Sequence, residues 1–267
     1  MTIIRTTALL LLTALLSVGC GQSGDGLKKV NLYGDSLSVE SAPFIKAALA
    51  KSGKVSFLSR AESGSAPCDW RGIIQHDVST RPPDVALVET YGNNASACQR
   101  GVGGTRPVFD TPGYWRMYHK DLDQLIKSFP RSTYVILLSA PAAAMDMKTG
   151  HSHKAHMLAL MRSIAHTRRN VTAVNAGGRL EFPAGHFARI LPCVAKTPCP
   201  NHPKPGMAVV RAKDGLHFCP VIIWAKLKLL EHCPVVAYGA WRYGLIQAVI
   251  AARAVGTNAT PPPLVKH

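Results

Sequence analysis

Short apolar runs alternate with helix-like segments along most of this 267-residue chain, and this alternation narrows its possible folds more than any other feature. The runs are nearly uninterrupted, so a strand built from one of them is apolar on both faces and must be covered on both. We therefore expect a three-layer α/β/α sandwich around a central parallel sheet of about five strands. The expected strands are Val30 to Tyr33, Val55 to Ser59, Val85 to Glu89, Tyr134 to Ser139 and Val171 to Asn175, and the expected helices include Val39 to Lys51, Tyr114 to Phe129 and His153 to Arg169.

The composition is that of one globular domain, because 47% of the residues are apolar and can form an ample core. We expect this domain at residues 28–256, after a leader at 1–19 and a tether at 20–27. Residues 257–267 include three consecutive prolines and are expected to be a disordered tail.

Two segments interrupt the alternation. Leu180 to Arg211 is rich in proline and lacks clear periodicity, so we expect a long ordered loop that shapes a cleft. Tyr238 to Ala254 is expected to form a helix docked on the domain, with a membrane-surface or partner helix as the alternative. Its expected apolar face comprises Trp241, Leu245, Ile246, Val249 and Ile250.

A serine stands where the first expected strand ends. Gly34-Asp35-Ser36-Leu37 directly follows the run at Val30 to Tyr33, so a tight turn presents Ser36 at the carboxyl edge of the sheet. Hydrolases place a nucleophilic hydroxyl on such a strand-to-helix turn. The alternative is a serine that only caps the next helix.

An acid and a base lie together near the other end of the chain. Asp214-Gly215-Leu216-His217 has the D-x-x-H spacing, which no other aspartate of the sequence shares. In a serine mechanism the imidazole takes the hydroxyl proton and the carboxylate orients the imidazole. A structural hydrogen-bonded pair is the alternative.

Two glycine turns lie between these motifs in the chain. Glu62-Ser63-Gly64-Ser65 follows the second expected strand, and Thr90-Tyr91-Gly92-Asn93-Asn94 follows the third. A backbone N–H at Gly64 and the amide of Asn94 are the kinds of donor that stabilise a tetrahedral oxyanion. Both turns are also explained by turn formation alone.

Together these four motifs resemble the SGNH hydrolase family, also called the GDSL esterase and lipase family, and the resemblance extends from about Lys28 to Leu230. It implies a flavodoxin-like fold and assigns Ser36 as nucleophile, Asp214 as orienting acid and His217 as base. It also implies an oxyanion hole built from the Ser36 and Gly64 N–H groups and the Asn94 side chain. The family usually has G-x-N-D in the third motif, whereas Ala95 replaces that aspartate here, and the Gly64 motif is the loosest match.

The resemblance implies a serine esterase that cleaves carboxylic (acyl) esters through an acyl-enzyme. Family substrates include lipids, small acids and O-acetylated sugars, so acyl groups on envelope glycans or glycolipids are expected substrates. An acyltransferase acting on envelope polysaccharide and a non-catalytic glycan-binding lipoprotein are the alternatives. The chemistry requires no metal or organic cofactor, and we expect none.

The first residues have the pattern of an export signal. Met1 to Thr7 carries Arg5, Ala8 to Val18 is apolar but short for a membrane span, and Cys20 follows Gly19. This predicts a bacterial lipoprotein acylated at Cys20. Lipoprotein cleavage sites usually have leucine three residues before the cysteine, whereas here the leucine lies four residues before it, at Leu16. An ordinary signal peptide is the alternative, and no second stretch approaches transmembrane length. We expect an extracytoplasmic protein of the cell envelope.

Cysteine usage is consistent with export. Beside Cys20 there are six cysteines, which permit fifteen disulfide pairings. Position along the chain favours a Cys68–Cys98 bridge that ties the two oxyanion turns together, a small Cys193–Cys199 loop, and a Cys219–Cys233 link. A zinc site is the alternative, and the absence of a C-x-x-C pair disfavours it.

The chain is strongly basic, with a formal net charge of +16. Removing residues 1–19 deletes only Arg5, which leaves 30 of the 31 Lys and Arg residues against 15 Asp and Glu. Because the basic residues are scattered and aromatic residues make up only 7%, we expect no nucleic acid partner. An anionic membrane or envelope polymer is the expected partner, and a charge that merely aids solubility is the alternative.

Three histidines, His151, His153 and His156, cluster near the start of an expected helix. They suggest a metal site, but no carboxylate or cysteine lies near them in the sequence. We therefore expect a solvated cluster rather than metal ligands.

Overall fold

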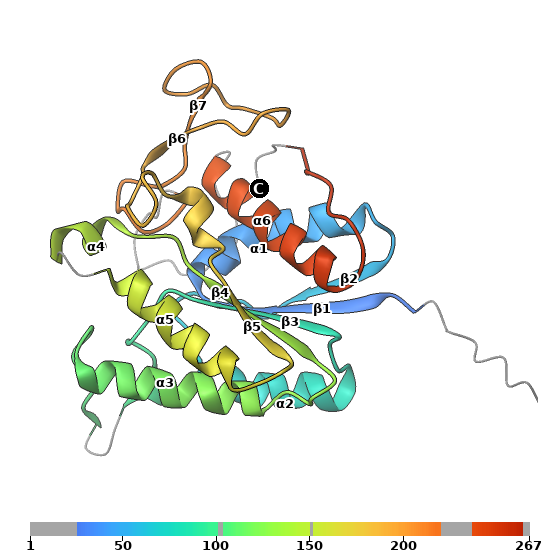
Figure 1. The fold of residues 1–267 in the computed structure, drawn as a ribbon, viewed down its shortest axis with the longest axis vertical. Coiled ribbons are helices and arrows are strands. Elements are labelled where there is room, and N and C mark those ends of the chain that lie inside the picture. Colours follow the sequence, from blue (N-terminus) through green and yellow to red (C-terminus); the bar gives the residue numbers. More distant parts are fainter. Residues whose placement is uncertain (1–25, 101–103, 150–151, 220–236, 264–267) are drawn as a thin grey trace, which may run out of the picture.

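The computed structural model describes residues 26–100, 104–149, 152–219 and 237–263. A five-stranded parallel sheet in the order β2-β1-β3-β4-β5 forms its middle layer (Figure 1). The strands are β1 (Lys28–Tyr33), β2 (Val55–Ser59), β3 (Val85–Thr90), β4 (Tyr134–Ser139) and β5 (Val171–Val174). The expected three-layer sandwich and its five strands are confirmed, with strand ends shifted by two residues at most.

Helices cover both faces of the sheet (Figure 1). One face packs against α1 (Ser36–Ala50) and α6 (Tyr238–Ala254), and the other packs against α2 (Trp70–Thr80), α3 (Pro112–Lys127) and α5 (His153–His166). The described residues also include α4 (Ala144–Thr149) and the 3₁₀ turns Ala97–Gln99 and Gly177–Leu180.

Alternation along the strands explains the two cores. In β3, Val85 and Leu87 belong to the core beneath α1 and α6, whereas Ala86 and Val88 belong to the opposite core. All four side chains are at most 2% exposed. A strand buried on both faces has no polar alternation, which is why an uninterrupted apolar run identified it correctly.

The C-terminal helix has the predicted bounds, and most of its predicted contact face packs on the core. Trp241 is fully buried, Leu245, Ile246 and Ile250 are half-buried against the core, and Val249 is half-buried. A glycine also belongs to the contact with α1, since a Cβ at Gly244 would lie 2.7 Å from the Ser41 carbonyl oxygen. Glycine lets the two helix backbones approach, so the interface includes a residue that carries no apolar signal.

The segment after α6 packs against the domain. The backbone N–H of Thr260 donates to the Ala48 carbonyl, and the Trp241 indole donates to the Pro262 carbonyl at 2.9 Å. A disordered tail was expected from residue 257, whereas residues 257–263 include these two contacts with the domain. A proline lacks an N–H group, but its carbonyl can still accept a hydrogen bond. Residues 264–267 lie outside the described part.

The proline-rich segment after β5 contains a small ribbon that the sequence did not indicate. Strands β6 (Ile190–Pro192) and β7 (Met207–Val209) pair antiparallel, and a Cys193–Cys199 disulfide closes the loop between them. The three-residue strands are too short to show alternation. The ribbon leads directly into the turn that carries Asp214 and His217.

Within the described ranges, every helix is too short or too polar to cross a bilayer. The leader at 1–19 and Cys20 lie outside them, as does the predicted partner of Cys219, Cys233.

Candidate functional site

Ser36 is the first residue of α1 and lies at the carboxyl end of β1. The side chain of Asp35 begins the helix, because its Oδ1 accepts the Leu37 N–H at 3.0 Å. A side chain at Gly34 would lie 2.0 Å from the Ser38 hydroxyl, so this turn requires glycine. The local sequence thus fixes a tight strand-to-helix turn, on which Ser36 is 9% exposed.

The turn Asp214–His217 lies next to Ser36, although His217 and Ser36 are 181 residues apart in the sequence. His217 Nε2 lies 3.0 Å from Ser36 Oγ, and His217 Nδ1 lies 2.7 Å from Asp214 Oδ2. The second oxygen of Asp214 accepts the Leu216 and His217 N–H groups, which closes the turn. Ser36, His217 and Asp214 therefore form a continuous hydrogen-bonded chain in the order that a serine mechanism needs.

Charges stabilise the protonated imidazole. Burial lowers the pKa of His217, but the hydrogen bond to Asp214 and the charges of Glu40, Asp214 and Asp35 raise it above its ordinary value in sum. Burial raises the pKa of Asp214, but hydrogen bonds from the His217 side chain and from the Leu216 and His217 N–H groups bring it down to about 2. Asp214 is thus ionised at neutral pH and favours the imidazolium that proton transfer creates.

The two glycine turns come to the same sheet edge. The Gly34 carbonyl accepts the Glu62 N–H at 2.8 Å and lies 3.4 Å from the Ser65 hydroxyl. Gly64, between them in the chain, has the left-handed φ of +79° that favours glycine. Its turn is therefore packed against the turn that carries Ser36.

The asparagine turn is anchored by the residue beside the predicted donor. Asn93 donates its amide to the Ser65 carbonyl at 3.1 Å and to Asp35 Oδ2 at 3.3 Å. The Asn94 amide donates to the Pro107 carbonyl at 3.4 Å, so a backbone carbonyl, rather than the family's aspartate, contacts it. The sequence did not indicate this role for Asn93, since an asparagine beside another in a turn looks interchangeable.

The predicted bridge between these turns is present. Cys68 and Cys98 form a disulfide, and Asp69 Oδ1 accepts the Ser96 hydroxyl at 2.7 Å across the same junction. The sulfurs of Cys68 and Cys98 lie near Asp69 in a grouping that resembles a metal site. Because both sulfurs are in the disulfide, they offer no thiolate to a metal.

Three buried acids near Ser36 were not anticipated from the sequence. Asp35, Glu40 and Glu89 are at most 4% exposed. Burial, followed by the charge of Asp35, raises the pKa of Glu89 well above its ordinary value, which favours its protonated form beside Asp35. The only available signal was position, because Glu89 ends an apolar run and Glu40 follows Ser36 by one helical turn.

The prediction of a solvated histidine cluster is wrong for His153. This ring is 2% exposed, its Nε2 lies 2.9 Å from the Tyr91 carbonyl oxygen, and it stacks on Phe109. Burial lowers its pKa. A Cβ at Gly92 would lie 2.4 Å from His153 Nε2, so the histidine ring packs directly against the turn that carries Asn93 and Asn94. His156 is exposed and His151 lies outside the described residues.

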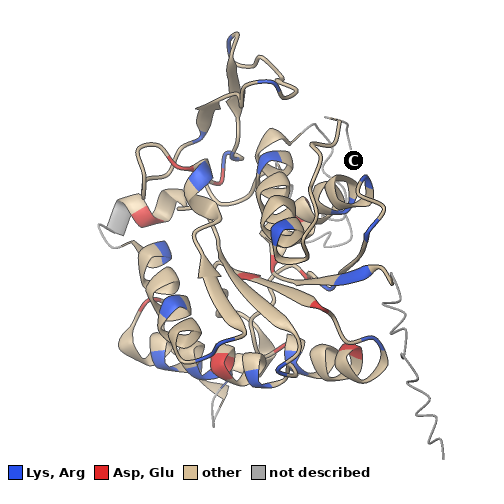
Figure 2. Cartoon of the chain, turned by 45° about the vertical axis from the view of Figure 1, so that its right-hand side comes forward, with Lys and Arg blue, Asp and Glu red and all other residues tan. Residues whose placement is uncertain are grey.

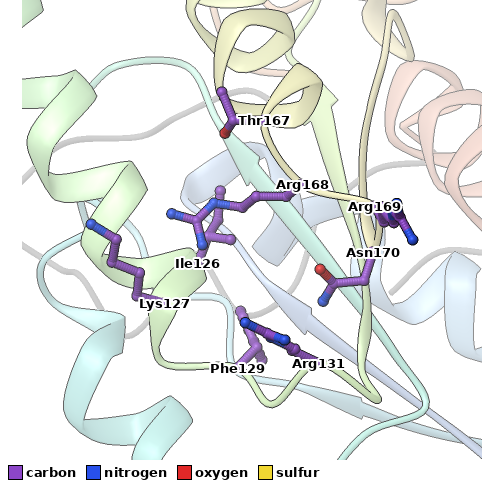
Figure 3. Close-up of a pocket in the computed structure, with 8 residues that line it drawn as sticks. All are labelled: Ile126, Lys127, Phe129, Arg131, Thr167, Arg168, Arg169 and Asn170. Atoms are coloured by element: carbon purple, nitrogen blue, oxygen red, sulfur yellow. The ribbon is translucent and has the colours of Figure 1, made fainter.

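A cavity of about 500 Å³ is lined by eight residues that precede β4 and β5 in the chain (Figure 3). It therefore lies at the amino ends of these strands, whereas Ser36 follows the carboxyl end of β1. Its basic side chains are Lys127, Arg131, Arg168 and Arg169. It lies between the ends of α3 and α5 and the starts of β4 and β5, where helix C-termini carry partial negative charge. Lys127 and Arg168 both form ion pairs with Asp123. Local ion pairs account for Lys127 and Arg168, and the cavity is not the candidate site, because it lies at the opposite ends of the strands from Ser36.

The fold is that of the SGNH hydrolases. Two solved structures share it with TM-scores of 0.51: a lipase/acylhydrolase from Enterococcus faecalis, at 14% identity over 88% of this chain and 98% of that one, and a catalytic mutant of an acetylxylan esterase from Geobacillus stearothermophilus, at 13% identity over 87% and 96%. The chain belongs to the family DUF459, described as a protein of unknown function, whose model matches residues 29–221. Comparison with curated proteins gives no match.

We expect the Asp214→Asn variant to lose about 10⁴-fold in kcat, because asparagine stabilises neither the required tautomer nor the imidazolium. The pKa of His217 is raised above its ordinary value of 6.5, and the base acts in its unprotonated form. The wild-type kcat/KM should therefore decrease towards low pH with a midpoint above pH 6.5. For the residual activity of the variant, this midpoint should lie at lower pH. Ester hydrolysis measured from about pH 5 to 9 checks both points. A wild-type limb near pH 4 would point to a carboxylate as the base.

Removing the Cys68–Cys98 bridge should loosen the turns after β2 and β3 without unfolding the sheet. For the Cys68→Ser/Cys98→Ser double variant we expect a loss of about 2–4 kcal/mol in the free energy of unfolding, because the bridge closes a loop of 30 residues. Activity should fall more steeply with temperature than in the wild type. Urea unfolding and esterase assays measure the two effects, and the Cys193→Ser/Cys199→Ser variant, whose loop spans 6 residues, is the matched control.

Proposed function

We propose that this protein is a serine hydrolase of carboxylic (acyl) esters. One observation carries the proposal: Ser36 Oγ lies 3.0 Å from His217 Nε2, and Asp214 Oδ2 lies 2.7 Å from the other ring nitrogen. This is the geometry of a nucleophile, its base and the group that orients the base. The likeness of the fold to the lipase/acylhydrolase and acetylxylan esterase structures is consistent with it.

The reaction proceeds in two halves. Ser36 Oγ attacks the ester carbonyl carbon while its proton passes to His217 Nε2, and the carbonyl electron pair moves to oxygen. The Ser36 and Gly64 N–H groups and the Asn94 amide stabilise that oxyanion. When the tetrahedral intermediate collapses, His217 returns the proton to the leaving alcohol. Water activated by His217 then adds to the acyl-enzyme, and the carboxylic acid leaves as Ser36 regains its proton.

An acylated envelope glycan or glycolipid is the proposed substrate, and export places the enzyme beside it. The leader and Cys20 have the sequence pattern of a lipoprotein signal, and two disulfides within the described residues suit an oxidising compartment. The similarity to an acetylxylan esterase structure favours an O-acylated sugar among the ester classes. An acyl acceptor other than water would make the same residues an acyltransferase.

An anionic membrane surface is the proposed partner. Three exposed apolar side chains follow residues that contact the site or its neighbouring turns. Val108 follows the Pro107 that contacts Asn94, and Met145, in α4, follows the Ala144 that donates to Gly215. Phe182, which is 72% exposed, follows the Glu181 that accepts the Ala142 N–H. Lys and Arg are spread over the molecule and outnumber Asp and Glu (Figure 2). Apolar side chains within a basic surface suit insertion among anionic headgroups.

The Ser36→Ala variant tests the proposed activity. Purified protein with Cys20→Ser, to avoid acylation, should hydrolyse short-chain nitrophenyl esters and an O-acetylated sugar, and Ser36→Ala should reduce kcat by about 10⁴-fold or more. Free acid and acyl product on an added alcohol are measured separately. Equal rates for the two proteins would contradict the proposal, and product found on the alcohol alone would identify a transferase.

Membrane association should depend on charge and on the apolar loops. The non-acylated protein should sediment with vesicles containing anionic lipid and not with zwitterionic vesicles, and binding should weaken as salt rises through about 0.15 M. Phe182→Ser and Val108→Ser together should reduce binding about tenfold, because two exposed apolar side chains are removed. Equal binding to both kinds of vesicle would exclude an electrostatic partner.

A further inference from the structure

Glu40 is an acidic residue buried in a place that the proposed reaction does not explain. It lies in α1 one turn after Ser36, so the two residues share one side of the helix. Its side chain is 4% exposed. Burying a carboxylate is costly unless the protein provides compensating partners, so the contacts of Glu40 should reveal its use.

The carboxylate of Glu40 holds the backbone that follows His217. Glu40 Oε2 accepts the N–H groups of Phe218 at 2.8 Å and of Cys219 at 2.9 Å. On the other side, the Arg211 guanidinium lies 4.9 Å from the centre of the Phe218 ring and donates to the Ala142 carbonyl. The residue after His217 is therefore fixed from both sides, by its N–H and by its ring.

Glu40 also contributes negative charge near the imidazole. Burial raises the pKa of Glu40 to about 7, although the charge of His217, the two N–H groups and the charge of Arg211 each lower it. In return, the charge of Glu40 adds to those of Asp214 and Asp35 in raising the pKa of His217. A charge at this place stabilises the imidazolium more than the neutral ring.

We propose that Glu40 is a positioning residue for His217, which it holds against Ser36 through the Phe218–Cys219 backbone and whose protonated form it favours. This inference rests on the proposed function, because it treats His217 as the base. Glu40 acts on the reaction through His217 and touches neither the substrate nor the reacting atoms.

Two variants separate the hydrogen bonds of Glu40 from its charge. Glu40→Gln keeps an oxygen that accepts the Phe218 and Cys219 N–H groups, and its new amide nitrogen replaces Oε1, which has no hydrogen-bond partner among the described residues. We expect Tm close to that of the wild type, KM unchanged and kcat lower by about tenfold. Glu40→Ala loses the bonds too, so kcat should fall about a hundredfold or more and the Phe218 and Cys219 amides should exchange faster with solvent.

The deciding measurement needs no substrate. NMR titration of the His217 ring, identified by the signal missing from His217→Gln, should give a midpoint at least about half a pH unit lower in Glu40→Gln than in the wild type. Asp121→Asn is the matched control, because it removes a mostly buried carboxylate from α3 on the other face of the sheet. Its His217 midpoint and kcat should equal those of the wild type.

The outcomes separate this inference from the proposed function. An unchanged His217 midpoint in Glu40→Gln, or amide exchange at Phe218 and Cys219 in Glu40→Ala equal to the wild type, would overturn the role of Glu40 even if the protein is an esterase. If Ser36→Ala and the wild type were equally inactive on every ester, the proposed function would fail, while the titration would still report whether Glu40 and His217 are coupled.

Discussion

The buried carboxylate of Asp35 is the interaction on which the site depends. Its Oδ1 accepts the Leu37 N–H and starts α1 at Ser36, and its Oδ2 accepts the Tyr91 N–H at 2.8 Å after β3. One side chain therefore joins the ends of two neighbouring strands. Burial raises the pKa of Asp35, while hydrogen bonds from Tyr91, Leu37 and Glu89 lower it. The pKa of Glu89 is raised well above its ordinary value, so Glu89 takes up a proton more readily than Asp35. Asp35 then stays ionised and accepts these hydrogen bonds.

The parallel sheet supplies the long-range part of the same arrangement. Strand β1 lies between β2 and β3, so the turns after these three strands meet at one edge. The turns after β2 and β3 contact each other through Asn93 and the Ser65 carbonyl and through the Cys68–Cys98 bridge. His217, which contacts Ser36, lies 181 residues after it in the sequence. Topology thus explains why motifs spread along the chain can share one site.

These features were predictable to different degrees for physical reasons. The strands were predicted correctly because burial on both faces leaves an uninterrupted apolar run. The turn that carries Ser36 and the turn that pairs Asp214 with His217 could be predicted because each is a short local motif. The contact face of α6 was predicted only in part, because close helix packing also selects small residues such as Gly244, which carry no apolar signal. Glu40, Glu89 and His153 were missed because a polar residue alone in the sequence looks solvated. Their partners, including the Phe218 N–H and the Tyr91 carbonyl, come from elements that only the fold brings near.

The net charge of the chain and the local charge of the site have opposite signs. The sequence carries +16, yet the charges that raise the pKa of His217 come from Glu40, Asp214 and Asp35. Of these, Glu40 and Asp35 are buried, and salt screens buried charges far less than exposed ones. Attraction to the proposed anionic partner should therefore respond to ionic strength, whereas the protonation of His217 should respond little. The fold separates the charge available for holding the protein at a surface from the charge that would govern proton transfer at Ser36.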